Sequence, residues 1–369
     1  MAKIRVLVVD GAVLFRRTVS DALSRDPGIE VVGAAANGKI ALHKIPQVHP
    51  DVITMDVEMP DGGGVKALEE IRKAHPALPV ILFTSLTEAG GHELFDALAL
   101  GAKDYVTKPP GGRGMDPAFK RVEEELVPKI RALCPRNVAP ASFQAARRIR
   151  AERESQPAAR RLQLDDADRP ARSSGPRKVG IVAIGVSTGG PNALAAIFAG
   201  LPKDLGVPIA IVQHMPPLFT KLLAERLTAV SQVAVHEAAA GDVLRPGEAW
   251  LAPGDHHMTV ARLGDRIRVE TNRGPPENSC RPSVDVLFRS VARTCGAQTL
   301  AIVLTGMGQD GLHGCEEIRE ADGQIIAQDE ASSIVWGMAG HVVRAGLADR
   351  VVPLPQIAET IVRTIRAGA

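Results

Sequence analysis

The chain has 369 residues, so at roughly 150 residues per domain it is long enough for two domains and a linker. Hydrophobic residues make up 45% and charged residues 23%, a composition that supports sizeable apolar cores and excludes a largely disordered protein. The net charge of +2 and the aromatic content of 3% give no support to a protein that binds nucleic acid or a membrane surface through basic patches or stacked bases.

Two features bear on the cellular compartment. The cysteines show neither CxxC spacing nor the density of a disulfide framework, which indicates free thiols in a reducing environment. They are Cys134, Cys280, Cys295 and Cys315. The first residues lead into a strand pattern without an apolar signal segment, and the longest uncharged stretch, 179–202, is interrupted by polar residues and glycines. We therefore expect a cytoplasmic protein without membrane insertion.

Residues 4–109 alternate five times between short apolar runs and amphipathic segments. The apolar runs lie at 4–10, 30–35, 51–56, 79–85 and 104–109. The segments between them, such as 64–75 and 88–100, have helical periodicity, and Gly101 is suited to end the second one. Near-continuous Val/Ile runs separated by helices predict a parallel sheet covered on both faces. A further helix is expected over 117–133.

Residues 135–176 differ in composition from the rest of the chain. They include nine Arg, nine Ala and five Pro, but only five residues from Val, Ile, Leu, Met and Phe. Such a segment cannot bury enough apolar surface to offset the entropy lost on ordering, which predicts a flexible linker. We therefore divide the chain into a domain at 1–125, a helix end and linker at 126–177, and a second domain at 178–369.

The second domain begins with another α/β pattern. A strand at 179–184 leads through a glycine-rich turn into a helix from Pro191, and strands follow at 209–213 and 299–305. The middle, about 233–290, is rich in Gly and Pro, with short strands at 248–252 and 266–270. The predicted fold class is α/β, with two doubly wound parallel-sheet domains, the first flavodoxin-like and the second Rossmann-like.

Polar residues lie at the ends of four of the predicted strands in the first domain: Asp10, Asp56, Thr84 and Lys108. Ligands of open parallel sheets bind at the carboxyl ends of the strands, so these side chains are expected to share one crevice. A carboxylate there can accept a phosphoryl group while Mg²⁺, a hydroxyl and a lysine neutralise its oxygens. The alternative is that both aspartates only cap the helices that follow them.

These four residues, with the segments 56–60 (Asp-Val-Glu-Met-Pro) and 108–109 (Lys-Pro), resemble the receiver domain of two-component response regulators. The resemblance implies that Asp56 is phosphorylated, that Thr84 and Lys108 serve the switch, and that Asp10, Asp56 and the backbone of Glu58 bind Mg²⁺. Receivers usually carry a second acid at the position of Gly11 and another at Gly63. Because each lost carboxylate removes a full charge from a hard-cation site, we expect Mg²⁺ binding to be weakened.

Three residues of the second domain suggest nucleophilic catalysis. Ser187 lies in the glycine-rich turn 185–190 at a helix start, where the helix dipole and free N–H groups favour developing negative charge. A dinucleotide site is disfavoured because Ser187 stands where GxGxxG needs a bare backbone. His214 and Asp310 each follow another predicted strand, so a nucleophile, a base and an orienting acid can converge. Taken singly, each residue also fits a cap, a surface position or a turn.

The second domain resembles the chemotaxis receptor methylesterases of the CheB type. The segments that carry this resemblance are 185–190 (Gly-Val-Ser-Thr-Gly-Gly), 213–216 (Gln-His-Met-Pro), 252–255 (Ala-Pro-Gly-Asp), 281–285 (Arg-Pro-Ser-Val-Asp), 304–311 (Leu-Thr-Gly-Met-Gly-Gln-Asp-Gly) and 327–328 (Ala-Gln). It implies Ser187 as nucleophile, His214 as general base and acid, and Asp310 as the residue that orients His214. Thr188, His257 and the Met307 backbone are implied as supporting or oxyanion-binding positions.

The implied reaction is hydrolysis of glutamyl methyl esters on chemoreceptors, with deamidation of receptor glutamine by the same route. The implied partners are methylated chemoreceptors as substrate and a chemotaxis histidine kinase as phosphodonor. The receiver is expected to cover the cleft until Asp56 is phosphorylated. The histidines of the second domain lack metal-ligand spacing, so no cofactor is expected for the esterase.

Two alternatives stay open at this point. One is a related serine esterase or amidase that acts constitutively on another protein. The other is a receiver-coupled binding module without catalysis. No helix-turn-helix followed by a basic recognition helix is apparent, which argues against a DNA-binding effector.

Overall fold

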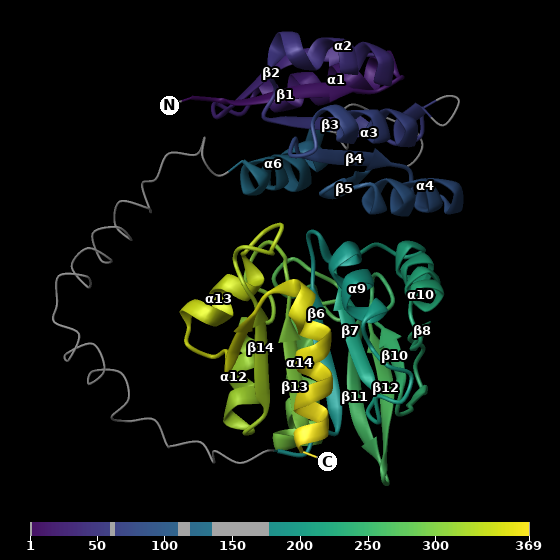
Figure 1. Cartoon of the computed structure of the whole chain (residues 1–369), viewed down its shortest axis with the longest axis vertical. Coiled ribbons are helices and arrows are strands. Elements are labelled where there is room, and N and C mark those ends of the chain that lie inside the picture. The colour runs from purple at the N-terminus through teal and green to yellow at the C-terminus, as the bar shows by residue number, and fades with distance from the viewer. Residues whose placement is uncertain (1, 60–62, 110–118, 135–176, 369) are drawn as a thin grey trace, which may run out of the picture.

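The computed structural model describes residues 2–59, 63–109, 119–134 and 177–368, which form two α/β domains (Figure 1). Each domain contains its own parallel sheet, as the alternation of apolar runs and helices predicts. The expected linker at 135–176 lies outside the described residues. None of the described helices is long and apolar enough to cross a membrane.

The N-terminal sheet contains five parallel strands in the order β2-β1-β3-β4-β5, the flavodoxin-like order. The strands are β1 (Ile4–Val9), β2 (Ile29–Ala35), β3 (Val52–Asp56), β4 (Val80–Thr84) and β5 (Asp104–Thr107). All residues of β3, β4 and β5 are buried, which explains their near-continuous apolar runs. The strand order reverses between β1 and β3, so Asp10 and Asp56 meet at a switch point of the sheet.

Helices cover both faces of this sheet. They are α1 (Val13–Ser24), α2 (Gly38–Val48), α3 (Gly63–Ala74), α4 (Glu88–Ala99), the π-helical turn η3 (Val122–Leu126) and α6 (Val127–Leu133). Gly101 follows α4 with φ of 101°, as expected of a residue that ends a helix. The helix expected over 117–133 is present from residue 119 and contains the π-helical turn η3 before α6, while residues 117–118 lie outside the described part of the chain.

The C-terminal sheet contains seven parallel strands in the order β15-β14-β13-β6-β7-β10-β8. They are β6 (Ile181–Val186), β7 (Ile209–Gln213), β8 (Ala234–Glu237), β10 (Glu248–Leu251), β13 (Thr299–Val303), β14 (Gln324–Gln328) and β15 (Arg350–Val352). A small antiparallel sheet is built from β9 (Val243–Leu244), β11 (His257–Leu263) and β12 (Arg266–Asn272). The strand order of the main sheet reverses between β6 and β13, which places the switch point of this sheet beside Ser187.

The C-terminal helices pack on both faces of the main sheet. They are α9 (Gly190–Ala199), α10 (Phe219–Val230), α11 (Val284–Cys295), the 3₁₀ turn η5 (Gly296–Gln298), α12 (Leu312–Glu320), α13 (Met338–Arg344) and α14 (Leu354–Ala367). No helix was predicted within 233–290, where α11 begins at Val284. The antiparallel pairing of β11 with β12 was also not predicted.

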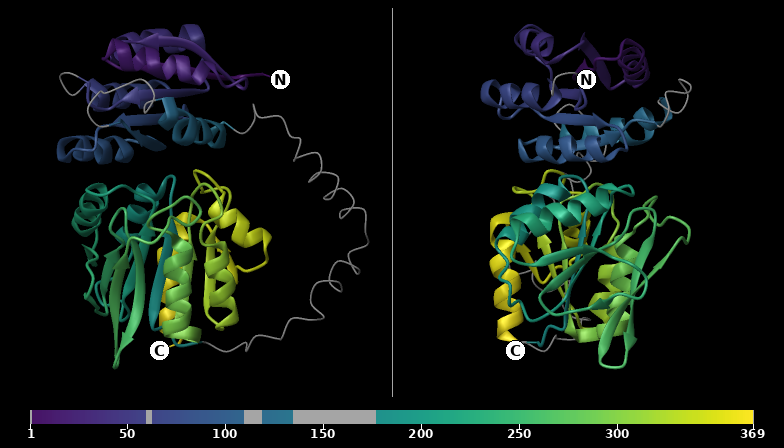
Figure 2. Two further views of the ribbon diagram at one scale, coloured as in Figure 1. Left: turned by 180° about the vertical axis from the view of Figure 1, so that it is seen from behind. Right: turned by 90° about the vertical axis from the view of Figure 1, so that its right-hand side faces the viewer.

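The two domains meet along α4, which lies over α9 and α10 (Figures 1 and 2). The contact is partly apolar, because the Tyr105 and Phe219 rings pack edge to face with centroids 5.8 Å apart. Gly91 permits the close approach, since a Cβ atom there would lie 2.3 Å from Leu222 Cδ1. Polar contacts add to it: Asn192 Nδ2 donates to the carbonyl of Leu98 at 2.7 Å.

Candidate active site

The turn after β6 holds Ser187 at the start of α9. Gly189 has φ of 77°, a left-handed conformation that favours glycine. Position 190 requires glycine because the Gln213 side chain lies close to its backbone: a Cβ atom there would lie 1.8 Å from Gln213 Oε1. Gln213 Nε2 donates to the carbonyls of Ser187 and His214 at 3.1 Å each, so one amide links the serine turn to the end of β7.

His214 and Asp310 form a close pair behind this turn. The imidazole Nε2 lies 2.7 Å from Asp310 Oδ2, and the aspartate is buried. The carboxylate lies at the N-terminus of α11, where the backbone N–H groups of Val284 and Asp285 donate to it at 2.7 and 3.1 Å. A helix N-terminus stabilises a negative charge, so α11 holds Asp310 ionised beside the histidine.

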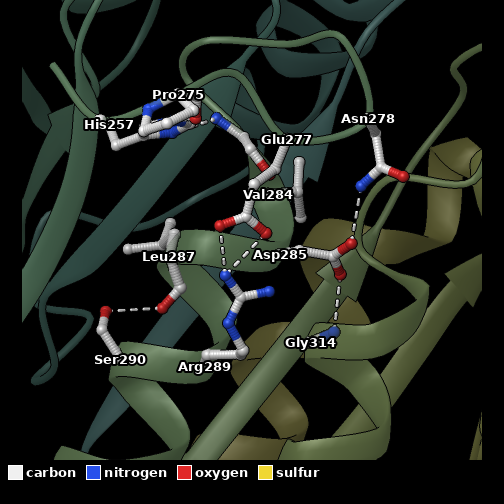
Figure 3. A network of polar contacts seen from close by, with 12 residues as sticks. His257, Pro275, Glu277, Asn278, Val284, Asp285, Leu287, Arg289, Ser290 and Gly314 are labelled. Carbon is white, nitrogen blue, oxygen red and sulfur yellow. Dashed lines mark hydrogen bonds and ion pairs between the residues drawn. The ribbon is translucent and has the colours of Figure 1, made fainter.

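A polar network lies beside Asp310 at the start of α11. Figure 3 shows the part of it around Asp285, whose carboxylate accepts from Asn278 Nδ2 and from the backbone N–H of Gly314. Asn278 Nδ2 donates both to Asp310 Oδ1 at 3.0 Å and to Asp285 Oδ2 at 2.8 Å. Ser283 Oγ also donates to Asp310 Oδ1, at 2.8 Å. His257 is buried and supports this loop, because its Nε2 donates to the Pro275 carbonyl while its Nδ1 accepts from Ser283 N. His257 is thus linked to Asp310 through Ser283.

The second ring nitrogen of His214 faces a cysteine. His214 Nδ1 lies 3.5 Å from Cys280 Sγ. Among the described residues, no hydrogen bond joins the Ser187 hydroxyl to His214. The backbone N–H of Ser187 is itself occupied, since it donates to the carbonyl of Thr305 at 3.0 Å.

The pairing shifts the pKa values of both members. Burial alone lowers the pKa of His214, but the hydrogen bonds with Asp310 and Cys280 outweigh it, so this pKa is raised. Burial alone raises the pKa of Asp310, but the hydrogen bonds from His214 and from α11 outweigh it, so this pKa is lowered. The pair is therefore arranged to stabilise an imidazolium beside a carboxylate.

A cavity of about 390 Å³ lies over the serine turn, between the two domains. Its C-terminal-domain wall includes Ser187, Thr188, His214, Cys280 and Met307, so four of the predicted catalytic or supporting residues share it. His257 does not belong to the lining of this cavity. Its other wall comes from the N-terminal domain and includes Asp104, Tyr105, Glu125 and Lys129.

A buried polar bridge crosses the domain boundary next to Ser187. Thr188 Oγ1 donates to Asp104 Oδ2 at 2.9 Å, and Lys129 Nζ lies 3.0 Å from the same oxygen. The Thr188 side chain is thus directed at the N-terminal domain.

The polar residues predicted in the first domain also converge. Lys108 Nζ lies 3.0 Å from Asp10 Oδ2 and 2.7 Å from Asp56 Oδ2. Burial raises the pKa of Asp56, and although Lys108 lowers it, Asp10 adds to the rise. Thr84 Oγ1 donates to the carbonyl of Gly90 in α4 at 3.0 Å.

Family models and individual proteins match the sequence of this chain. A model of the CheB methylesterase matches residues 182–361, and a model of the response regulator receiver domain matches residues 6–115. A protein-glutamate methylesterase/protein-glutamine glutaminase of Trichodesmium erythraeum is 48% identical over 366 residues, which cover 99% of this chain and 100% of that protein. One of the same name from a Nocardioides species is 45% identical over 368 residues, 99% of this chain and 96% of that protein.

The chain belongs to the CheB methylesterase family. It is a hydrolase with an N-terminal receiver domain, and the fold class predicted from the sequence is confirmed. The crystal structure of the Thermotoga maritima CheB methylesterase catalytic domain is similar, with 39% identity and a TM-score of 0.50. The match covers 50% of this chain and 98% of the Thermotoga maritima chain.

Two departures of the receiver from the usual pattern are visible in its site. Gly11 is exposed at the edge of a cavity of about 630 Å³ that Gly63 also lines. The Glu58 carboxylate accepts hydrogen bonds from the backbone N–H and hydroxyl of Ser85, which hold this side chain at the end of β4. Within the described part of the chain, the side-chain carboxylates that meet at Lys108 are those of Asp10 and Asp56.

Several residues of the methylesterase site were not predicted. Gln213 and Ser283 lie within motifs that resemble the family, but no role followed from the sequence. Asn278 and Cys280 lie in a loop without a recognisable motif. Asp104 belongs to the other domain, and only its folded position brings it to Thr188.

Proposed function

We propose that this chain hydrolyses glutamyl methyl esters on chemoreceptors with the catalytic triad Ser187, His214 and Asp310, under control of receiver phosphorylation. The observation that carries the proposal is the shared cavity of Ser187 and His214, with His214 hydrogen-bonded to the buried Asp310. By the same chemistry the enzyme deamidates receptor glutamine. We place the reaction in the cytoplasm.

The reaction proceeds by acyl transfer. Ser187 Oγ attacks the ester carbonyl while His214 Nδ1 accepts the hydroxyl proton, and Asp310 stabilises the resulting imidazolium. His214 returns this proton to the departing methoxide, which leaves as methanol. Water then attacks the acyl-enzyme with His214 again as base, which releases the glutamate carboxylate and restores the Ser187 hydroxyl. The backbone around Met307, across the same cavity, supplies donors for the oxyanion.

Before His214 Nδ1 can accept the Ser187 proton, the side chain of Ser187 or His214 must move, because Nδ1 faces Cys280 while the receiver covers the cavity. Catalytic hydrogen bonds are often long before substrate binds and shorten only in the reactive complex. A receiver that covers the cavity and bonds to Thr188 is consistent with a resting enzyme. The direct test is methanol release from a methylated chemoreceptor, which we expect from the wild-type chain and not from Ser187→Ala.

Phosphorylation would act through α4. Asp56 accepts the phosphoryl group from a chemotaxis histidine kinase, and Lys108 beside it neutralises part of the added charge. The Thr84 hydroxyl, which now donates to Gly90 in α4, is the nearby donor that a phosphoryl oxygen can recruit. When the Thr84 hydroxyl donates to the phosphoryl oxygen, its hydrogen bond to Gly90 is lost. This would release the first turn of α4, the helix that packs on α9 and α10.

Mg²⁺ fits the oxygen donors of this receiver, since Asp10, Asp56 and the Glu58 backbone offer hard ligands and the ion would neutralise phosphoryl charge. The set lacks the acid usually found at Gly11. We expect Gly11→Asp to bind Mg²⁺ about tenfold more tightly, ~1.4 kcal/mol, because affinity follows the number of anionic ligands. Titration of both proteins with Mg²⁺ measures this difference.

Two results would contradict this prediction or the switch it serves. Equal Mg²⁺ affinities in wild type and Gly11→Asp would show that the site is complete without that acid. A phosphodonor that stimulates the esterase equally in Asp56→Asn would show that the receiver acts without phosphorylation.

The pH dependence of the esterase should reflect the raised pKa of His214. Only the neutral imidazole accepts the Ser187 proton, so the rate rises with pH through that pKa, and the half-maximal point should lie above the ordinary value of about 6.5. Asp310→Asn should move this half-maximal point to lower pH. A neutral amide stabilises the imidazolium less than the carboxylate does, while burial still lowers the pKa of His214. Profiles of kcat/KM for both proteins test this, and a wild-type half-maximal point below that of free histidine would contradict it.

A further inference from the structure

Cys280 presents a thiol in the catalytic cavity that the proposed reaction does not use. It lines both the cavity over Ser187 and an adjoining one of about 630 Å³ between the domains. The other three cysteines are buried, whereas Cys280 is partly exposed. Its sulfur faces His214 Nδ1, the nitrogen that points away from Asp310.

The separation of these two atoms fits two ligands of one metal ion. Zinc bonds of about 2.3 Å to sulfur and 2.0–2.1 Å to nitrogen, at a tetrahedral angle, place the two ligand atoms about 3.6 Å apart. The observed distance from Cys280 Sγ to His214 Nδ1 is 3.5 Å. An ion can therefore bind both atoms with little movement of either side chain.

The surroundings of His214 also resemble those of a metal-bound histidine. Such a histidine usually donates its other N–H to a carboxylate, which fixes the ring and makes the ligand nitrogen more basic. Here Nε2 lies 2.7 Å from Asp310 Oδ2. Cys280, His214 and Asp310 place one ligand atom each within 4.8 Å of one another. Asp310 is occupied by donors from α11 and from Ser283, so it acts as the outer partner and not as a ligand.

We propose that Cys280 and His214 form an inhibitory binding site for a thiophilic divalent cation, of which Zn²⁺ is the representative. Binding joins the metal to Sγ and Nδ1, and the Cys280 thiol releases its proton to solvent. Two positions of the ion stay open for water or the Ser187 hydroxyl. The Nδ1 lone pair is then no longer available for the Ser187 proton, and ester hydrolysis stops until the ion leaves.

The ligand pair selects the kind of ion. A thiolate and an imidazole suit Zn²⁺ and related transition metals, whereas Mg²⁺ prefers carboxylate, carbonyl and water oxygens. The cation that serves the receiver should therefore not inhibit the esterase at this site.

The test uses the full chain with a non-thiol reductant, which keeps Cys280 reduced. Co²⁺ reports ligation by a thiolate-to-metal charge-transfer absorption, and Zn²⁺ is titrated against methyl-ester hydrolysis. The variants are Cys280→Ser and, as a matched control, Cys295→Ser, which makes the same change at a buried cysteine at the end of α11. Each rate is expressed relative to the metal-free rate of the same variant.

Wild type and Cys295→Ser should show the thiolate absorption and lose hydrolysis as Zn²⁺ is added, but not with Mg²⁺. Cys280→Ser should lack the absorption and need at least about tenfold more Zn²⁺ for the same fractional loss, since even outer-shell changes cost about that much affinity. His214→Gln provides a second check, because its Co²⁺ affinity should also fall, whatever its activity.

Equal Zn²⁺ sensitivity in Cys280→Ser and Cys295→Ser, or no thiolate absorption in wild type, would overturn the proposal. The inhibitory effect rests on the proposed role of His214 as base, whereas binding does not. Absorption without inhibition would therefore leave the metal site intact and count against that role, so the two failures are distinguishable.

Discussion

Ser187→Ala is expected to lower methyl-ester hydrolysis by on the order of 10⁵- to 10⁶-fold, and His214→Ala by a similar amount. The members of such a triad act as a unit, so the loss of either one removes nearly all of their joint effect. Asp310→Asn should cost less, on the order of 10⁴-fold, because it disturbs the orientation and charge of His214 and leaves the nucleophile in place. Methanol release from a methylated chemoreceptor measures all three.

A control variant separates loss of the nucleophile from damage to the cavity. Ser279→Ala makes the same change in the wall of the same cavity and should cause a far smaller loss. Full activity of Ser187→Ala would contradict the proposed mechanism. If that result came with an inactive Cys280→Ala, the nucleophile would be Cys280, whose sulfur is hydrogen-bonded to His214 Nδ1.

The parallel sheets could be predicted because their signal is local. Val/Ile runs separated by helical periodicity fix both the element type and the parallel pairing, and polar residues at strand ends then meet at the switch points. Asp10, Asp56 and Lys108 converge for this reason, as do Ser187, His214 and Asp310.

The support of the site could not be predicted in the same way. The start of α11 follows a Gly- and Pro-rich segment where no helix was predicted, although its N-terminal N–H groups hold Asp310. Cys280 reaches His214 from a loop 66 residues away. His257 was expected as a supporting or oxyanion-binding position, and its place in β11 directs its ring nitrogens to Pro275 and Ser283.

The contact between receiver and methylesterase domain depends on tertiary structure alone. The Asp104 that accepts from Thr188 begins a buried strand, and in the sequence it resembles any residue at a strand start. Gly91 resembles a weak position in a helix, yet its missing side chain is what lets α4 approach α10. The role of such positions in the domain contact can be recognised only from the structure of both domains together.

Gly91→Leu is expected to raise the basal esterase rate of the unphosphorylated chain. The three atoms nearest to a Cβ at this position all belong to Leu222 and Phe219 of α10, so a leucine side chain would force the domains apart. The receiver itself should not be weakened, because leucine in place of glycine within a helix gains roughly 0.5–1 kcal/mol. Opened states of two-state proteins are often populated at about 0.1–10%, so full release corresponds to a rise of roughly 10- to 1000-fold.

The matched control is His92→Leu, which adds the same side chain on the exposed face of the same helix and should leave the basal rate unchanged. The fragment 178–369 gives the upper limit of release, and the related Thermotoga maritima catalytic domain has been crystallised as a separate chain. Phosphodonor stimulation should shrink in Gly91→Leu, because an open cleft leaves less for phosphorylation to release. If Gly91→Leu and the fragment hydrolyse the ester no faster than wild type, the receiver does not restrain the enzyme through α4. The Thr188–Asp104 bond would then be a structural contact without regulatory effect.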